Sequence, residues 1–363
     1  MDKIQSPDQS ERLFFMDNLR IALTVLVVMH HQSLLVLAMP LFLMLNQAYF
    51  MGLFFFLSGC FTPASYDRKG MWIFLKDRLI RLGIPILIYV FILSPIAGFL
   101  MSIYQNEISG TAIISLTWKQ YSSMIGIGPL WFLVMLLIFD ICYFLGRGLI
   151  KNKPGETKNE NYAAPGISSI LLFILIIAIV NYLIRIIIPI NKYILFFPSL
   201  AYLPQYVSFF ILGIISYRQK WLNLIPAKLG KTGFILAIAG TIILMPLAIS
   251  NILGSASDFT GGGTWKSGVY SLWDSLFSVG LCLGLLVFFR RYFNHQKNFG
   301  KNLQRSCFTV YIIHSLIIFI PAYFLYNLQI IPQLKFILAS CISVPLSFVI
   351  AYLIGKIPII KKD

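Results

Sequence analysis

The residues with the clearest capacity for chemistry are Arg20 and His31, which lie in the first apolar stretch of the chain. They are eleven positions apart, which on a helix is about 1100°, only about 20° more than three full turns. Both side chains therefore share one helix face, about 16 Å apart along its axis. Asp17 shares that face and could orient Arg20 or cap the helix, whereas His30 points about 100° away. A titratable imidazole inside an apolar helix predicts a functional site, because burying it is unfavourable.

A second candidate cluster is the pair Arg78 and Arg81, in a basic segment that precedes an apolar run. Residues three apart on a helix project together, and two guanidinium groups on one face can bind phosphate oxygens in a bidentate manner. The pair therefore predicts a phosphate-binding site. The alternative is that both arginines anchor their helix at the membrane surface, with the aliphatic stems in lipid.

Other ionisable side chains also fall inside apolar runs: Asp140, Arg185, Asp274 and His314. Arg185 and Asp274 are expected at the same depth with opposite charge, so we expect them to form an ion pair. Any of the four could be a structural polar group. A carboxylate that approached His31, from Asp140 or Asp274, would fix the tautomer of that imidazole as in a catalytic triad.

Helices that cross a membrane must position these residues. Hydrophobic residues make up 58% of the chain and charged residues 12%, well below the roughly 25% charged residues of a soluble domain. The apolar residues form runs of about 20, the length of a membrane-spanning helix, without the period-two alternation of a membrane barrel. We therefore predict an all-α, polytopic membrane helix bundle of about ten transmembrane helices. The spans are expected at 19–39, 47–62, 82–101, 128–147, 167–190, 201–217, 231–250, 268–289, 306–325 and 334–355.

The net charge of +16 reflects membrane topology. With the N-terminus in the cytosol, 24 of the 29 Lys and Arg residues fall on the inner side, as the positive-inside rule requires. We therefore expect cytosolic N- and C-termini, a multi-pass location in the inner or plasma membrane, the lipid bilayer as a partner, and no nucleic acid. Residues 1–16 are predicted to form a cytosolic tail and residues 17–363 a single transmembrane domain.

Metal and nucleotide motifs are missing from the sequence. His30 and His31 face different directions, and the five cysteines have no metal-ligand spacing, so no metal is expected. The chain has neither a phosphate-binding loop of the Walker type nor a dinucleotide fingerprint, so nothing supports ATP-driven transport.

Taken in order, these motifs resemble the integral-membrane acyltransferase family 3, which includes O-antigen, peptidoglycan and periplasmic-glucan acyltransferases. The likeness rests on Asp-x-x-Arg with Arg-x10-His (Asp17, Arg20, His31), Phe-Phe-x-Leu-Ser-Gly ending at Gly59, Arg-x-x-Arg-Leu-x-x-Pro (Arg78 to Pro85), Leu-Trp-Phe-Leu around Trp131 and Tyr-x-x-His ending at His314. The chain departs from some members at Pro129, where they carry a histidine.

The resemblance implies site residues. His31 is expected to be the catalytic histidine, and Arg20, Arg78 and Arg81 are expected to bind the donor. Supporting positions are expected for a further set of residues: Asp17, Asp140, Asp274, His314 and Trp131.

The resemblance also implies a reaction: transfer of a short acyl group, acetyl or succinyl, from cytosolic acyl-CoA to a hydroxyl of an extracytoplasmic glycan. Such an enzyme belongs to the acyltransferases that transfer groups other than aminoacyl groups, with acyl-CoA as co-substrate and no tightly bound cofactor. His31 could act as general base or carry the acyl group transiently, and the sequence leaves both open. The alternatives are a proton-coupled secondary transporter or polysaccharide exporter, since buried Asp, Arg and His also suit a carrier, and a non-catalytic partner of a polysaccharide synthase.

Overall fold

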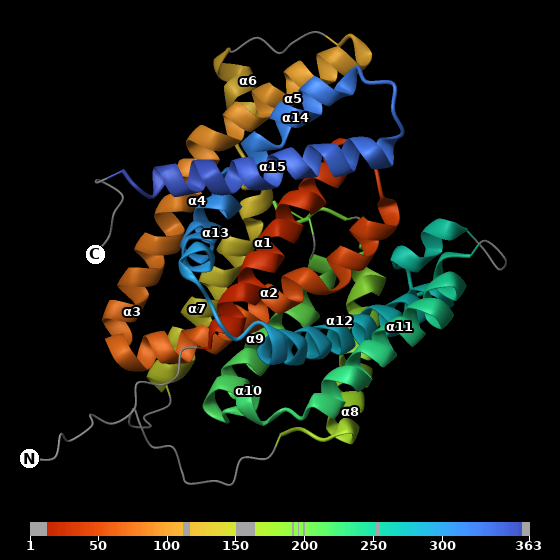
Figure 1. Cartoon of the computed structure of the whole chain (residues 1–363). Coiled ribbons are helices and arrows are strands. Elements are labelled where there is room, and N and C mark those ends of the chain that lie inside the picture. Colours follow the sequence, from red (N-terminus) through yellow and green to blue (C-terminus); the bar gives the residue numbers. More distant parts are fainter. Residues whose placement is uncertain are drawn as a thin grey trace, which may run out of the picture.

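The computed structural model is a bundle of α-helices (Figure 1). It describes residues 13–111, 117–149 and 164–357, apart from 191, 195, 199 and 251–254. About 85% of it is helical, and the only β-type pairing in these ranges is an isolated bridge between Ile194 and Phe197. The predicted all-α class is confirmed.

The α-helices are α1 (Phe14–Leu35), α2 (Pro40–Lys69), α3 (Met71–Arg78), α4 (Ile84–Ile88), α5 (Ser94–Ser109), α6 (Trp118–Ser123), α7 (Trp131–Leu149), α8 (Ile167–Ile187), α9 (Leu203–Arg218), α10 (Trp221–Leu224), α11 (Ala227–Ile249), α12 (Trp265–Tyr292), α13 (Asn298–Ile317), α14 (Phe319–Tyr326) and α15 (Pro332–Ile354). Two π-helical turns, η1 (Leu79–Gly83) and η2 (Tyr89–Leu93), and three 3₁₀ turns, η3 (Gly128–Leu130), η4 (Leu200–Tyr202) and η5 (Ala256–Thr260), complete the set.

Within the described ranges, nine helical segments are long and apolar enough to cross a membrane. They are Pro40–Lys69, Met71–Ser109, Trp118–Leu149, Ile167–Ile187, Leu200–Arg218, Ala227–Ile249, Trp265–Tyr292, Asn298–Tyr326 and Pro332–Ile354. These segments correspond to nine of the ten expected spans. The remaining span, expected at 19–39, corresponds to α1, which has 22 residues but is less apolar because it carries Asn18, Arg20 and a polar run from His30 to Gln32. The cytosolic placement of the termini stays a prediction.

The start of the chain differs from the expected boundaries. Residues 1–12 of the predicted tail lie outside the described residues, and α1 begins at Phe14. Residues 40–46, which lie between the first two expected spans, are helical: only residues 36–39 separate α1 from α2. Pro40 stands at the start of α2, where a missing N–H leaves no helical hydrogen bond unmade.

The segment Met71–Ser109 is one long helical path with two wider turns. Pro85 follows η1 and Pro95 follows η2, each near the first position of the next α-helix. A proline cannot donate to the carbonyl four residues earlier, and its ring clashes with that carbonyl. The π turn before each proline widens the helix where that clash would occur, so the two prolines account for the two turns.

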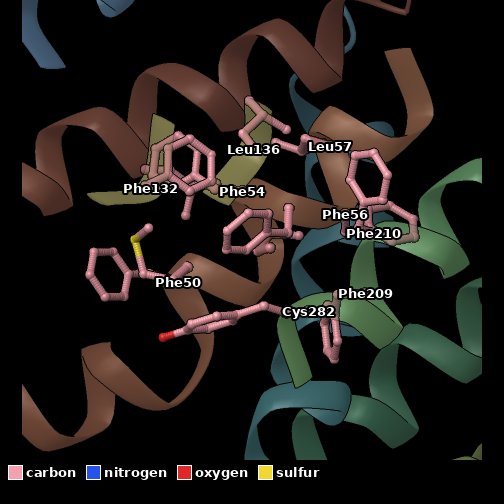
Figure 2. Packing of buried hydrophobic residues seen from close by; sticks show 14 of the residues in the cluster. Phe50, Phe54, Phe56, Leu57, Phe132, Leu136, Phe209, Phe210 and Cys282 are labelled. Carbon is pink, nitrogen blue, oxygen red and sulfur yellow. The ribbon is translucent and has the colours of Figure 1, made fainter. Parts of the chain in front are cut away.

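An aromatic core holds α2, α7 and α9 together. Figure 2 shows side chains of α2 beside Phe132 of α7 and Phe209 and Phe210 of α9. A Cβ atom on Gly59 would collide with the backbone oxygen of Phe210, and one on Gly213 with that of Phe56. Glycines at these positions therefore let the backbones of α2 and α9 approach closely.

Helices from the C-terminal part of the chain pack against the first helix. α15 contacts both α1 and α13, and α13 also contacts α1; Figure 1 shows α15 crossing over the other two. This three-helix arrangement decides what surrounds the histidines of α1.

Candidate active site

Three of the four histidines of the chain gather near the C-terminal end of α1. The ring centre of His31 lies 4.9 Å from that of His314 on α13, with the ring planes at 46°. The adjacent His30 lies 5.6 Å from His31, nearly edge-on. The structure thus brings His314, which the sequence places in a distant helix, beside His31.

The His314 side chain is fully buried and held in one orientation. Its Nδ1 lies 2.8 Å from the backbone oxygen of Tyr311. A carbonyl oxygen can only accept, so Nδ1 carries the hydrogen and donates, and Nε2 is left as a bare acceptor. Nε2 is buried and finds no hydrogen-bond partner in the described part of the chain.

His30 and His31 have different surroundings, although the sequence separates them only by spacing. The ring of His30 stacks on Phe50 at 5.1 Å, and Asn46 Nδ2 donates to its Nδ1 at 3.3 Å. His30 is therefore a buried, hydrogen-bonded packing residue. His31 is partly exposed, and its ring faces that of His314.

Arg20 lies toward the other end of α1 from His31. Its Nη1 is 3.8 Å from Asp17 Oδ1, and its guanidinium lies 4.8 Å from the ring centre of Phe61 on α2. The residue at the N-cap of α1 is Leu13, without a side-chain cap. Asp17 thus pairs with Arg20 one turn away instead of capping the helix.

Arg78 and Arg81 lie in different environments. Arg78 ends α3, and its Nε is 3.2 Å from Asp140 Oδ2, with the two side chains 14% and 1% exposed. Asp140 Oδ1 also accepts from Thr62 Oγ1 at 2.9 Å. Arg81 lies within η1 and is exposed. The wider π turn between the two residues means that they do not share a face as closely as α-helical spacing predicts.

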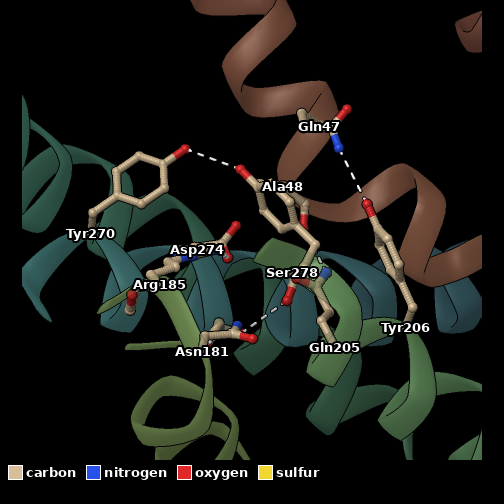
Figure 3. Close-up of polar contacts among 12 residues, drawn as sticks. Gln47, Ala48, Asn181, Arg185, Gln205, Tyr206, Tyr270, Asp274 and Ser278 are labelled. Atoms are coloured by element: carbon tan, nitrogen blue, oxygen red, sulfur yellow. Dashed lines mark hydrogen bonds and ion pairs between the residues drawn. The ribbon is translucent and has the colours of Figure 1, made fainter. Parts of the chain in front are cut away.

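The expected ion pair between Arg185 and Asp274 is present. Arg185 Nη2 lies 2.7 Å from Asp274 Oδ2, and both side chains are fully buried (Figure 3). Arg185 Nη1 also donates to Ser271 Oγ at 2.9 Å, and the guanidinium lies over the rings of Tyr202 and Tyr270 at 4.8 and 5.4 Å. This cluster joins α8, η4 and α12.

The two carboxylates that could have oriented His31 are therefore both engaged with arginines: Asp140 with Arg78 and Asp274 with Arg185. The partner that the structure gives His31 is a second imidazole. In the described residues, no three His, Cys, Asp or Glu side chains are grouped so that they could hold a metal ion.

Trp131 is linked to the histidines through its neighbours. Its buried ring, at the start of α7, lies 5.6 Å from the ring of Tyr206 on α9. Two residues earlier, the backbone oxygen of Pro129 accepts a hydrogen bond from the Tyr311 hydroxyl. Tyr311 thus ties α13 to the start of α7 and also supplies the carbonyl that holds His314. Its position three residues before His314 is visible in the sequence, but its two partners are not.

The acyltransferase family 3 model, described as an acyltransferase domain, matches residues 13–355. The match includes all the candidate residues and nearly the whole chain, so the protein belongs to this family of membrane acyltransferases. It is a multi-pass membrane protein and an acyltransferase. No curated protein matches the chain, and no solved structure matches it.

Proposed function

We propose that the protein moves a short acyl group, acetyl or succinyl, from cytosolic acyl-CoA to a hydroxyl of an extracytoplasmic glycan, in the inner or plasma membrane. One observation carries this proposal. The partly exposed His31, on the same helix as Arg20, faces a second, fully buried imidazole. A base deep in the bundle and cations nearer the cytosolic end suit a reaction whose two substrates come from opposite sides.

In this proposal, the cations bind the phosphates of acyl-CoA. Arg81 is exposed, and the Arg78 ion pair engages Nε, which leaves its two Nη groups for bidentate contact with a phosphate. Arg20 lies at the base of α1, about 16 Å below His31 along the helix. The flexible arm of the donor then carries the thioester along α1 toward the imidazole.

The chemistry at His31 is transfer of an acyl group from sulfur to oxygen. The bare imidazole nitrogen accepts the proton of the glycan hydroxyl as the oxygen attacks the thioester carbonyl carbon. The new C–O bond forms, the C–S bond breaks, and the proton passes to the departing thiolate, which leaves as CoA-SH. A transient acyl-histidine would use the same residue in two such steps.

The test is acyl-CoA binding and CoA-SH release by the purified protein in lipid nanodiscs, with acetyl-CoA and succinyl-CoA compared. His31→Ala is expected to lower turnover by at least about 100-fold, the lower end of the contribution of a general base, with acyl-CoA binding retained. His30→Ala is the matched control and is expected to keep turnover. If the wild type binds neither donor, the proposal falls, and proton-coupled transport becomes the next function to assay.

A further inference from the structure

The most conspicuous unpaired atom near the candidate base is Nε2 of His314. It is buried, and no described residue donates to it. Native proteins rarely leave a buried polar atom unpaired, because such an atom loses its water partners without replacement. Since Nδ1 is committed to the backbone oxygen of Tyr311, only a donor can satisfy Nε2.

The geometry indicates which donor that is. The rings of His31 and His314 are 4.9 Å apart, centre to centre. Each ring nitrogen lies about 1 Å from its ring centre, so facing nitrogens can be about 3 Å apart, the length of an N–H···N hydrogen bond. No such bond forms in the present orientation of the rings. A bond between the two rings therefore requires the His31 ring to turn about its Cβ–Cγ bond until one of its nitrogens faces Nε2.

We infer that His314 is a positioning residue for His31, whose imidazole donates one N–H to His314 Nε2 and so presents its other nitrogen bare to the acceptor hydroxyl. This inference rests on the proposed function and deepens it. The neutral imidazole of His314 then fixes the tautomer of His31, as a carboxylate fixes the tautomer of the histidine in a catalytic triad. The difference is that a neutral partner adds no negative charge to the membrane interior.

With the inferred bond in place, the three residues form a directed chain of hydrogen bonds. The Tyr311 carbonyl accepts from His314 Nδ1, and His314 Nε2 accepts from His31. When the hydroxyl attacks the thioester, its proton goes to the bare nitrogen of His31 and from there to the departing thiolate. His314 keeps its own Nδ1 hydrogen throughout. Because Tyr311 also donates a hydrogen bond to Pro129, the chain of hydrogen bonds begins at a residue that is tied to η3.

His30 provides the control. It is a histidine next to His31 and is buried, but its Nδ1 already accepts from Asn46. Replacing it removes an imidazole from the same cluster without removing the acceptor that faces His31. The variants to compare are therefore His314→Phe, His314→Gln and His30→Gln, because phenylalanine keeps a ring without an acceptor and glutamine restores a polar acceptor.

The first experiment is ¹⁵N spectroscopy of the histidine-labelled protein in lipid, which needs no substrate. With only four histidines in the chain, the His31 signals can be assigned by single substitutions. The wild type is expected to show one His31 tautomer, with its protonated nitrogen hydrogen-bonded and His314 Nε2 as the acceptor. In His314→Phe, the signals of two tautomers are expected. Two His31 tautomers, or a free Nε2 on His314, in the wild type would overturn the inference even if no variant folds.

The second experiment measures acyl transfer. His314→Phe is expected to lower kcat by tenfold or more while the KM for acyl-CoA changes less than threefold. His314→Gln should recover part of the loss, and His30→Gln should resemble the wild type. Equal kcat in the wild type and His314→Phe would overturn the inference while leaving the proposed function intact. Absence of acyl-CoA turnover in the wild type would instead remove the proposed function, and the spectra would still decide the hydrogen bond.

Discussion

The Nε atom of Arg78 lies 3.2 Å from Oδ2 of Asp140, so a carboxylate from α7 holds one of the cations assigned to the donor. Thr62 of α2 donates to the other carboxylate oxygen. Three helices thus meet at this ion pair. The carboxylate orients Arg78 but does not reach the histidines, which separates the two halves of the proposed site.

A double-substitution experiment separates the structural and binding roles of this pair. Arg78→Ala leaves a buried carboxylate without its cation, and losing one partner of a buried pair costs roughly 3–5 kcal/mol of stability. We expect Arg78→Ala to lower the thermal midpoint and raise the KM for acyl-CoA. In the double variant Arg78→Ala/Asp140→Asn, the thermal midpoint should return most of the way to the wild-type value, whereas the KM for acyl-CoA should stay raised. Recovery of both values by the double variant would show that Arg78 has no contact with the donor.

Arg81→Ala is expected to change donor binding without changing stability. Arg81 is exposed, and surface substitutions away from special features usually change stability by less than about 0.5 kcal/mol. Loss of one charge-assisted contact to a phosphate should raise the KM for acyl-CoA by about tenfold, equivalent to about 1.4 kcal/mol. The control is Arg68→Ala, because Arg68 is an exposed arginine on the neighbouring helix α2. An equal effect of both substitutions would point to general membrane-surface charge instead of a phosphate site.

Substitutions in the pair formed by Arg185 and Asp274 are expected to affect the fold more than the chemistry. Either Arg185→Leu or Asp274→Leu leaves one uncompensated buried charge and should destabilise the protein by roughly 3–5 kcal/mol, whereas the double leucine variant should be markedly more stable than either. Thermal unfolding in detergent measures this. Asp67→Asn is the control, because Asp67 forms an ion pair with Arg218 in which both side chains are about a third exposed, and such pairs contribute about 1 kcal/mol or less. Loss of acyl transfer at unchanged stability in Arg185→Leu would place this cluster on the substrate path.

Gly59→Ala is expected to separate α2 from α9. The added Cβ would meet the backbone of Phe210, which cannot move aside as a flexible side chain can, and overpacking of this kind typically costs about 1–3 kcal/mol. Gly146→Ala on α7 is the matched control, since the added Cβ has no atom within 4 Å and alanine favours the helix by roughly 0.5–1 kcal/mol. The thermal midpoint should fall for the first variant and rise or stay constant for the second.

Much of the architecture can be predicted from the sequence because it depends on local properties. Apolar run length decides which segments cross the bilayer, and nine of the ten expected spans coincide with apolar helices. Equal depth and opposite charge were sufficient to pair Arg185 with Asp274, because the interior of a bilayer offers a buried charge few other partners. The π turns before Pro85 and Pro95 could be predicted from the two prolines, but a hydropathy profile does not show them.

The arrangement of the candidate site depends on tertiary packing, and the sequence could not supply it. Helical spacing places Arg20 and His31 on one face of α1, but it cannot show which other helix approaches that face. His314 reaches His31 only because α13 packs against α1. Asp140 likewise reaches Arg78 only because α7 packs against α3. Spacing alone also could not reveal that His30 contacts Asn46 and Phe50, whereas His31 faces His314.

The polarity of α1 has a consequence for how the protein is made. Insertion of a helix from the translocon is opposed by its polar and charged side chains, and α1 carries Arg20 and the polar run from His30 to Gln32. Only residues 36–39 separate it from α2, which contains a stretch apolar enough to cross a membrane. We therefore expect the two helices to enter the bilayer together as a hairpin during synthesis. If synthesis stopped before α2 had emerged, we expect α1 and its histidines to stay outside the bilayer, so the depth of the His31 imidazole would depend on the helix that is translated after α1.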